Sequence, residues 1–327
     1  MSQYIIAVDL GGTRLRSARM DDDLNILMRH EELTLAHEGI DATLERVMSV
    51  IHQVMPGDPT TVDGIGISIP GPTNPFTGVV ELGTNLKGWQ GIPLAQLVNE
   101  EFGVPVYLGN DANVAALAEV ARGAAQGCRH AIFITVSTGI GGGVIINGKM
   151  LLGVNGYAAE VGHMILEVDG KPTTLEKVAA GPALARQARS RIQSGLRSSM
   201  LDMVDGKLDA ISGSTVGKAA REGDALALEI IHKAGVRLGY GVTSLLHIFN
   251  PEIVVFGGGV SYGVGDLLLE PMREIVQQLA IDDAYYKDLR YAIAELGENV
   301  SVVGAGALVA TRGGVEDVAK AARKLAE

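Results

Sequence analysis

Apolar runs of strand length alternate with amphipathic stretches along the whole chain. Tyr4–Val8 and Gly64–Ile69 are short, continuous apolar runs, as expected of buried strands. Ile40–Met55 carries apolar residues at helical spacing, and Ala225–Phe249 predicts a long helix that ends at Asn250-Pro251. This alternation predicts an α/β fold.

One arrangement, a strand followed by a glycine turn and a returning strand, occurs twice. Each copy is followed later by a strand that ends in a turn of small or polar residues. This weak internal duplication predicts two related lobes with a cleft between them, where a ligand is expected. In the first copy, strand Tyr4–Val8, turn Gly11-Gly12 and strand Leu15–Met20 are followed later by strand Val104–Leu108, which ends at Asn110-Asp111. In the second copy, strand His130–Val136, turn Gly139–Gly143 and strand Val144–Met150 are followed later by strand Ile253–Phe256, which ends at Gly257–Gly259.

The length of 327 residues also suits two domains better than one. We expect a small α/β lobe at 1–118, completed by a C-terminal helical segment at 303–327. The large α/β lobe is expected at 119–302. The boundary lies within the Ala-rich stretch Ala112–Ala125, which predicts a helix.

Composition excludes several classes of protein. The formal net charge of −11 and the aromatic content of 4% argue against a nucleic-acid partner. The N-terminus lacks the features of a signal peptide, and no apolar run reaches the length of a membrane span. The single cysteine, Cys128, allows neither an intrachain disulfide nor a thiolate zinc cluster. These features predict a cytoplasmic protein without a membrane partner.

Three glycine turns at strand ends are candidate phosphate sites, because glycine lets backbone amides approach an anion closely. The alternative for the first is a plain hairpin turn. None matches a P-loop or the full dinucleotide-binding fingerprint, so a nicotinamide enzyme fits poorly. Together the three turns favour a bound nucleotide. The candidate nucleotide-binding residues are Asp9, Gly11, Gly12 and Thr13 in the first turn, Thr138, Gly139 and Gly141 in the second, and Gly257, Gly258 and Gly259 in the third.

Several polar residues are candidates for chemistry. Asn110-Asp111 lies where a strand meets a helix, so it is either an N-cap pair or a carboxylate placed for catalysis. Glu160 and His163 share a face if that stretch turns helically, and they could then bind neighbouring sugar hydroxyls. The alternative for them is an exposed polar pair. Taken by itself, Glu176 is typical of a solvent-exposed helix residue, and Asn85 is typical of a turn residue.

From Asp9 to about Leu308, the series of motifs resembles the ROK family of sugar kinases, repressors and related open reading frames. Each motif is weak alone, but their order and spacing are specific. The motifs are Asp9–Thr13 and Thr138–Gly143 as phosphate loops, Ile67–Pro72 and Asn85–Trp89 as sugar-side segments, Asn110–Asn113 as the catalytic segment, Glu160–Met164 as the sugar clamp, and Asn250–Gly259 beside the adenine.

The resemblance implies a two-lobed actin-like ATPase (RNase H-like) fold with sugar and ATP meeting in the cleft. Asp111 would be the general base on the sugar hydroxyl that attacks the γ-phosphate. Asp9 would hold Mg²⁺, directly or through water. The implied sugar-binding residues are Gly71, Asn85, Asn110, Asp111, Glu160, His163 and Glu176, and the implied ATP-binding residues are the glycine-turn candidates named above.

Two departures from the family pattern stand out. Most ROK proteins carry a cysteine-rich zinc segment after the Gly-His, whereas here a short connection without cysteine follows His163. No structural zinc is therefore expected, and the shortened connection bears on whether Glu176 reaches the sugar. Ser137 stands where the family commonly has glycine before Thr-Gly.

Glucose is the expected substrate, because Asn85–Trp89 and Pro70–Pro72 are glucokinase-like. N-acetylmannosamine, N-acetylglucosamine, fructose, allose and mannose remain alternatives, and polyphosphate is an alternative donor. A ROK repressor would need a helix-turn-helix domain, and only eight residues precede Asp9. A non-catalytic sugar sensor is a further alternative. Family members are commonly dimers or tetramers, so a homo-oligomer is expected.

Overall fold

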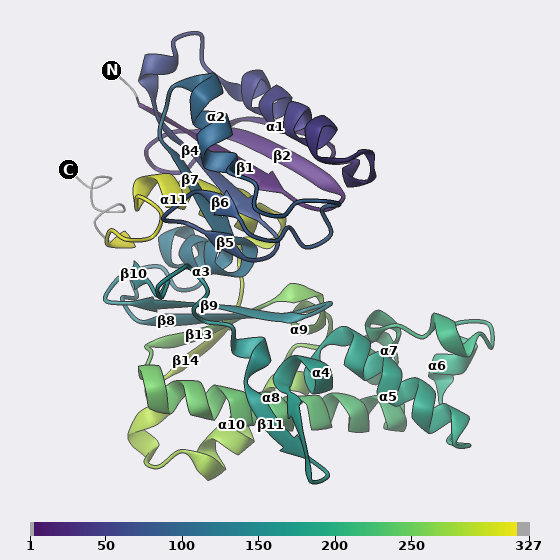
Figure 1. The fold of residues 1–327 in the computed structure, drawn as a ribbon. Coiled ribbons are helices and arrows are strands. Elements are labelled where there is room, and N and C mark those ends of the chain that lie inside the picture. The colour runs from purple at the N-terminus through teal and green to yellow at the C-terminus, as the bar shows by residue number, and fades with distance from the viewer. Residues whose placement is uncertain (1–2, 319–327) are drawn as a thin grey trace. The chain divides into compact units, whose positions relative to one another are not determined.

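The computed structural model describes residues 3–318 (Figure 1). The chain divides into two compact units. Of the described residues, unit 1 comprises those within Met1–Ala131, Gly143–Ala159 and Glu295–Glu327, and unit 2 comprises Ile132–Gly142 and Glu160–Ala294. The lobe boundaries expected from the sequence stay a prediction, and residues 319–327 of the expected C-terminal segment lie outside the described residues.

Unit 1 contains a five-stranded sheet of order β3-β2-β1-β4-β7. β1 pairs antiparallel with β2 and parallel with β4, and β4 pairs parallel with β7, so the carboxyl ends of β1, β4 and β7 lie at one edge. A two-stranded hairpin, β5–β6, follows β4. The strands are β1 Tyr4–Leu10, β2 Arg14–Met20, β3 Ile26–Leu33, β4 Val62–Ile69, β5 Thr73–Asn74, β6 Val79–Val80 and β7 Val106–Asn110.

Helices pack on this sheet because their apolar residues match its buried faces. The helix α11 is apolar around nearly its whole circumference and is buried. It can approach β4 closely because Gly66 has no side chain: a Cβ there would lie 1.8 Å from the carbonyl oxygen of Ala305. The helices of unit 1 are α1 Ile40–Val54, α2 Leu94–Phe102, α3 Asp111–Arg122 and α11 Val300–Ala310.

A second five-stranded sheet has the order β10-β9-β8-β13-β14, and a separate hairpin pairs β11 with β12. β10 and the residues of β9 from Gly143 onward belong to unit 1, and outside its strands unit 2 is mostly helical (Figure 1). These elements are β8 Ala131–Val136, β9 Ile140–Ile146, β10 Lys149–Met150, β11 Ile165–Val168, β12 Lys171–Thr174, β13 Ile253–Gly257, β14 Arg290–Ile293, α4 Leu175–Ala179, α5 Gly181–Gln193, α6 Ser199–Asp202, α7 Gly213–Arg221, α8 Ala225–Phe249, α9 Gly258–Val264 and α10 Asp266–Leu279.

The long helix α8 has the bounds predicted from the sequence. The Asp224 side chain accepts a hydrogen bond from the Ala227 amide at its start. Asn250 ends the helix in the left-handed conformation, with φ of 44°, and Pro251 follows. Local signals at both ends therefore determine its length.

The expected glycine turn at Gly139–Gly143 is wrong in extent, because β9 already begins at Ile140. Gly141 therefore lies within a strand. Gly143 does too, and the reason for glycine there is packing: a Cβ would lie 2.5 Å from the Cβ of Ala116 on α3. Among residues 3–318, no helix combines the length and apolar character needed to cross a bilayer.

Candidate functional site

In unit 1, candidate residues converge at the carboxyl edge of the parallel strands. Asp9 on β1 lies opposite Ser68 on β4, and Ser68 lies opposite Gly109 on β7. Asn110 and Asp111 follow Gly109 directly. Residues about 100 positions apart in the chain therefore meet because parallel strands end at the same edge.

Asn110 caps α3. Its Oδ1 accepts a hydrogen bond from the Ala112 amide at 3.0 Å, and its Nδ2 donates to the Gly71 carbonyl oxygen at 3.1 Å. Asp111 is the first residue of the helix, is exposed, and its Oδ1 accepts from the Ala112 amide at 2.8 Å. Both side chains thus accept from the same amide; Asn110 is the N-cap residue, and the Asp111 carboxylate lies at the surface of unit 1.

Asp9 is largely buried, with 15% of its side chain exposed. Burial raises the pKa of Asp9 from 3.8 to about 6; the nearby Arg16 guanidinium lowers it, and the Asp111 carboxylate raises it further. The nearest Arg16–Asp9 nitrogen–oxygen distance is 3.7 Å. The negative charge of Asp9 is thus incompletely compensated by its surroundings.

This environment suits Mg²⁺, which prefers carboxylate oxygens and usually keeps several waters and phosphate oxygens as its other ligands. Among residues 3–318, no group of three or more His, Cys, Asp or Glu side chains is arranged to hold a metal ion. Asp9 could supply one carboxylate ligand to such an ion.

Two sugar-side candidates of unit 1, Asn85 and Gly71, lie on tight turns with positive φ. Asn85 is left-handed, with φ of 63°, and a Cβ on Gly12 would lie 2.9 Å from the Cβ of Asn85. Gly71 has φ of 101°, and a Cβ there would lie 2.2 Å from the Leu82 carbonyl oxygen. The structure therefore brings the first glycine turn against Asn85, and Gly71 against Asn110.

The first glycine turn joins the hairpin β1–β2. The Gly11 amide donates to the Arg14 carbonyl oxygen at 2.9 Å, and the Thr34 amide donates to the Thr13 carbonyl oxygen at 2.9 Å. The side chain of Thr13 is exposed. The segment is thus a hairpin turn in its geometry, which leaves its use as a phosphate loop a prediction.

In unit 2, Ile140 organises the second glycine turn and the Glu-x-x-His segment. Its amide donates to Glu176 Oε2 at 2.9 Å. Its carbonyl oxygen packs against Gly162, where a Cβ would lie 1.9 Å from that oxygen. Glu160 precedes a single 3₁₀ turn, Val161–His163, and the His163 amide donates to the Glu160 carbonyl oxygen at 3.0 Å.

Both Glu160 and His163 are exposed. Glu160 is the N-cap residue, with ψ of 61°, and no α-helix forms there, so the shared face expected from the spacing of these two residues stays a prediction. Glu176 follows the β11–β12 hairpin, which occupies the shortened connection, and one of its oxygens already binds the Ile140 amide. Gly139 lies beside this carboxylate: a Cβ there would lie 2.6 Å from Glu176 Oε2.

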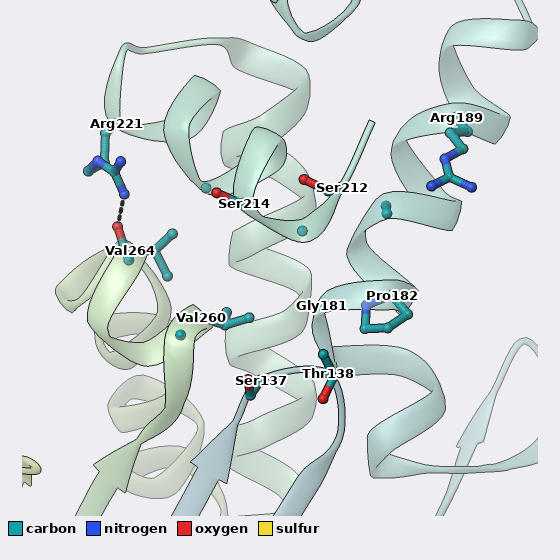
Figure 2. A pocket seen from close by; sticks show the side chains of 15 residues that line it. Ser137, Thr138, Gly181, Pro182, Arg189, Ser212, Ser214, Arg221, Val260 and Val264 are labelled. Atoms are coloured by element: carbon teal, nitrogen blue, oxygen red, sulfur yellow. Dashed lines mark hydrogen bonds between the residues drawn. The ribbon is translucent and has the colours of Figure 1, made fainter. Parts of the chain in front are cut away.

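A cavity of about 570 Å³ opens in unit 2 and is lined mainly by residues of α5, α7 and α9 (Figure 2). Of the predicted ATP-binding residues, Thr138 and Gly259 line it. Gly257 ends β13, and Gly258 starts α9 with φ of 88°, packed under the Val136 carbonyl oxygen. Neither of them, nor Gly139 or Gly141, is part of the cavity lining.

Most of the cavity wall was not identified in the sequence analysis. The wall includes two basic side chains that bind backbone carbonyls: Arg189 donates to Ile211 at 3.1 and 2.6 Å, and Arg221 donates to Gly263 (Figure 2). The signals for these segments were a Gly-Pro pair and a capping box at helix starts, which indicate helices but no ligand. The unidentified lining residues are Ser137, Gly181, Pro182, Ala185, Arg189, Ser212, Gly213, Ser214, Gly217, Arg221, Val260, Gly263 and Val264.

Comparisons with known proteins agree with the motif series. The family model of the ROK family matches residues 5–312. A glucokinase of Halalkalibacterium halodurans is 32% identical over 94% of this chain and 95% of that protein. The xylose repressor of Bacillus subtilis is 26% identical over 94% of this chain and 77% of that protein. A crystal structure of a ROK family glucokinase from Streptomyces griseus, in complex with glucose and AMPPNP, has a TM-score of 0.74 and 32% identity, covering 93% of this chain and 98% of that one.

The two α/β units and the structural match define a protein of the actin-like ATPase class, so the predicted fold is confirmed. Within that class, the chain belongs to the ROK family.

Proposed function

We propose that this protein is an ATP-dependent sugar kinase that transfers the γ-phosphate to a hexose hydroxyl, with glucose as the substrate. The observation that carries the proposal is the 570 Å³ cavity of unit 2, whose wall includes the predicted ATP residues Thr138 and Gly259. Similarity to glucokinases over nearly the whole chain supports the choice of reaction and sugar. Action in the cytoplasm and assembly as a homo-oligomer belong to the same proposal.

In this mechanism Asp111 accepts the proton of the attacking hydroxyl. Its carboxylate is exposed at the first residue of α3, and Asn110 accepts from the same Ala112 amide, so the helix cap does not depend on Asp111 alone. Phosphoryl transfer depends mainly on positioning and charge stabilisation. Asp9 would hold Mg²⁺, which when bound neutralises charge on the phosphates. The remaining sugar hydroxyls would be bound by Gly71, Asn85, Asn110, Glu160, His163 and Glu176.

Glu176 has a second task in this proposal. Because its Oε2 accepts from the Ile140 amide, it also holds the second glycine turn in place. A sugar contact would use the other carboxylate oxygen. The same residue would then connect the sugar site to the position of Thr138, two residues before Ile140 in the chain.

An ADP-release assay across a panel of hexoses and N-acetylhexosamines tests the function. We expect the highest kcat/KM with glucose and ATP. Higher kcat/KM with N-acetylmannosamine, N-acetylglucosamine or fructose would reassign the substrate within the family, and polyphosphate in place of ATP would reassign the donor. No turnover with any sugar and either donor would contradict a kinase.

A non-catalytic sugar sensor is the second candidate, and the similarity to a xylose repressor favours it. The two functions differ in one measurement. A sensor binds sugar in calorimetry but releases no ADP, whereas a kinase does both.

Filling the cavity of unit 2 should weaken nucleotide binding. Gly259 lines the cavity, and the nearest atom to a Cβ there is Ser137 Oγ at 3.9 Å, so Gly259→Leu adds bulk without a clash against the fold. We expect KM for ATP to rise at least about tenfold while KM for the sugar changes little. The matched control is Gly57→Leu, which adds the same side chain where a Cβ meets nothing within 4 Å. An unchanged KM for ATP would remove this cavity from nucleotide binding.

A further inference from the structure

A second, much smaller cavity lies in unit 1, and Asn110 is one of its lining residues. It is lined in part by Thr73 of β5, by Gly109 and Asn110 of β7, and by Asn113 of α3. The volume open to the centre of a water molecule is about 10 Å³, which corresponds to about one water. The cavity is therefore too small for a substrate and large enough for a single solvent molecule.

Two polar side chains of this cavity are buried without a partner. Thr73 is 1% exposed and Asn113 is 4% exposed. Within residues 3–318, neither Thr73 Oγ1 nor Asn113 Oδ1 has a hydrogen-bond partner. Asn110, by contrast, already uses its amide with Ala112 and Gly71. Buried polar groups are rarely left unsatisfied, and a water that joins two such groups is the usual solution.

We propose that one buried water bridges Thr73 and Asn113, and that these two are positioning residues for the Asn110-Asp111 segment. The Thr73 hydroxyl donates to the water, and the water donates to Asn113 Oδ1. Thr73 lies two residues after Gly71, and Asn113 lies two residues after Asp111. The water thus forms a second connection between these segments, parallel to the hydrogen bond from Asn110 to Gly71.

The consequence concerns the base. The first turn of α3 carries Asp111, and small displacements of a catalytic group are costly in rate. A bridge that holds this turn against β5 should therefore affect kcat more than sugar binding. This part of the inference rests on the proposed function, whereas the water itself does not.

The test uses two substitutions of similar shape: Thr73→Val removes the hydroxyl, and Asn113→Leu removes Oδ1 together with Nδ2. Each single variant leaves the other side chain with an incomplete partner set, and the double variant removes both atoms that the water bridges. We expect each single variant to lower kcat roughly tenfold with KM for the sugar within about twofold. The double variant should lie within about twofold of the slower single variant, because both substitutions break one bridge. Thr73→Ser keeps the hydroxyl and should restore most of the lost kcat.

Thr43→Val provides a matched control. Thr43 is a fully buried threonine of α1 whose hydroxyl donates to the Gly39 carbonyl oxygen at 2.7 Å, away from the site. It should lower the unfolding midpoint without lowering kcat. A crystal structure of the parent protein should show a water within hydrogen-bond distance of both Thr73 Oγ1 and Asn113 Oδ1.

The possible results distinguish the bridging water from the positioning role of Thr73 and Asn113. Absence of that water, together with additive effects of the two single substitutions on the unfolding midpoint, would overturn the bridge. A bound water with kcat unchanged in both single variants would overturn the positioning role. If the parent turns over no sugar, the proposed function fails, and the crystal structure and the unfolding midpoints still decide on the bridge.

Discussion

Asp111→Asn is expected to reduce turnover by roughly 10²–10⁴-fold while sugar affinity stays close to that of the parent. Asparagine has nearly the same shape but cannot accept the hydroxyl proton as the carboxylate does. The fold should tolerate the change, because Asn110 provides the side-chain cap of α3 and Asp111 is exposed. The loss should therefore appear in kcat rather than in the free energy of unfolding.

Turnover is measured by ADP release and sugar affinity by isothermal titration calorimetry. Asp63→Asn removes an exposed carboxylate from β4 and serves as the control for the loss of one charge. Near-normal turnover of Asp111→Asn would remove Asp111 from the mechanism. Loss of sugar binding together with turnover would instead make it primarily a sugar ligand.

Asp9→Asn is expected to stabilise the ligand-free protein above pH 6 by about 3 kcal/mol and to abolish most activity. The pKa of Asp9 rises from 3.8 to about 6 because the carboxylate is buried, so its ionisation opposes folding. Asparagine avoids that cost. Arg16 keeps a partner in the variant, because its Nε also lies 3.8 Å from Glu31 Oε2.

The pH dependence follows from the direction of this shift. Between pH 4 and 6 the folded protein binds more protons at Asp9 than the unfolded chain, so its stability falls as pH rises through that window. The stability advantage of Asp9→Asn should therefore be largest at pH 8 and roughly half as large at pH 5. Denaturant titrations at both pH values, without nucleotide or Mg²⁺, measure it.

Asp63→Asn again serves as the control, since it removes an exposed carboxylate from the neighbouring strand. A variant Asp9→Asn that is less stable than the parent at pH 8 would mean that Arg16 and the Ser301 side chain, which also lower the pKa of Asp9, stabilise the carboxylate by more than burial costs. Stability gained together with unchanged turnover would contradict a role for Asp9 in binding Mg²⁺.

The elements with strong local signals were predicted well. α8 has its predicted bounds because a cap and a proline define its ends, and β4 and α1 agree within two residues because burial imposes their periodicity. The extent of the second glycine turn was wrong. Glycine is typical of both tight turns and close packing, and Gly143 proved to serve packing against α3.

The spatial relations between candidate residues were more predictable from sequence in unit 1 than in unit 2. Asp9 and Asn110-Asp111 could be related from sequence, because parallel strands that end in polar residues share one edge. The hydrogen bond between Glu176 and the Ile140 amide could not be predicted from sequence, because it depends on where the β11–β12 hairpin positions α4. The cavity of unit 2 likewise combines residues of three helices, α5, α7 and α9, whose relative positions no local pattern specifies.

The sequence by itself determined the fold class, the family and the identity of Asp111 as the proposed base, because motif order and hydrophobic periodicity are properties of the linear chain. Only the tertiary structure decided that Asn110 connects the start of α3 to Gly71, that burial raises the pKa of Asp9, and that Thr73 and Asn113 share a cavity. Those features arise from contacts between segments remote in sequence, which no local pattern of residues specifies.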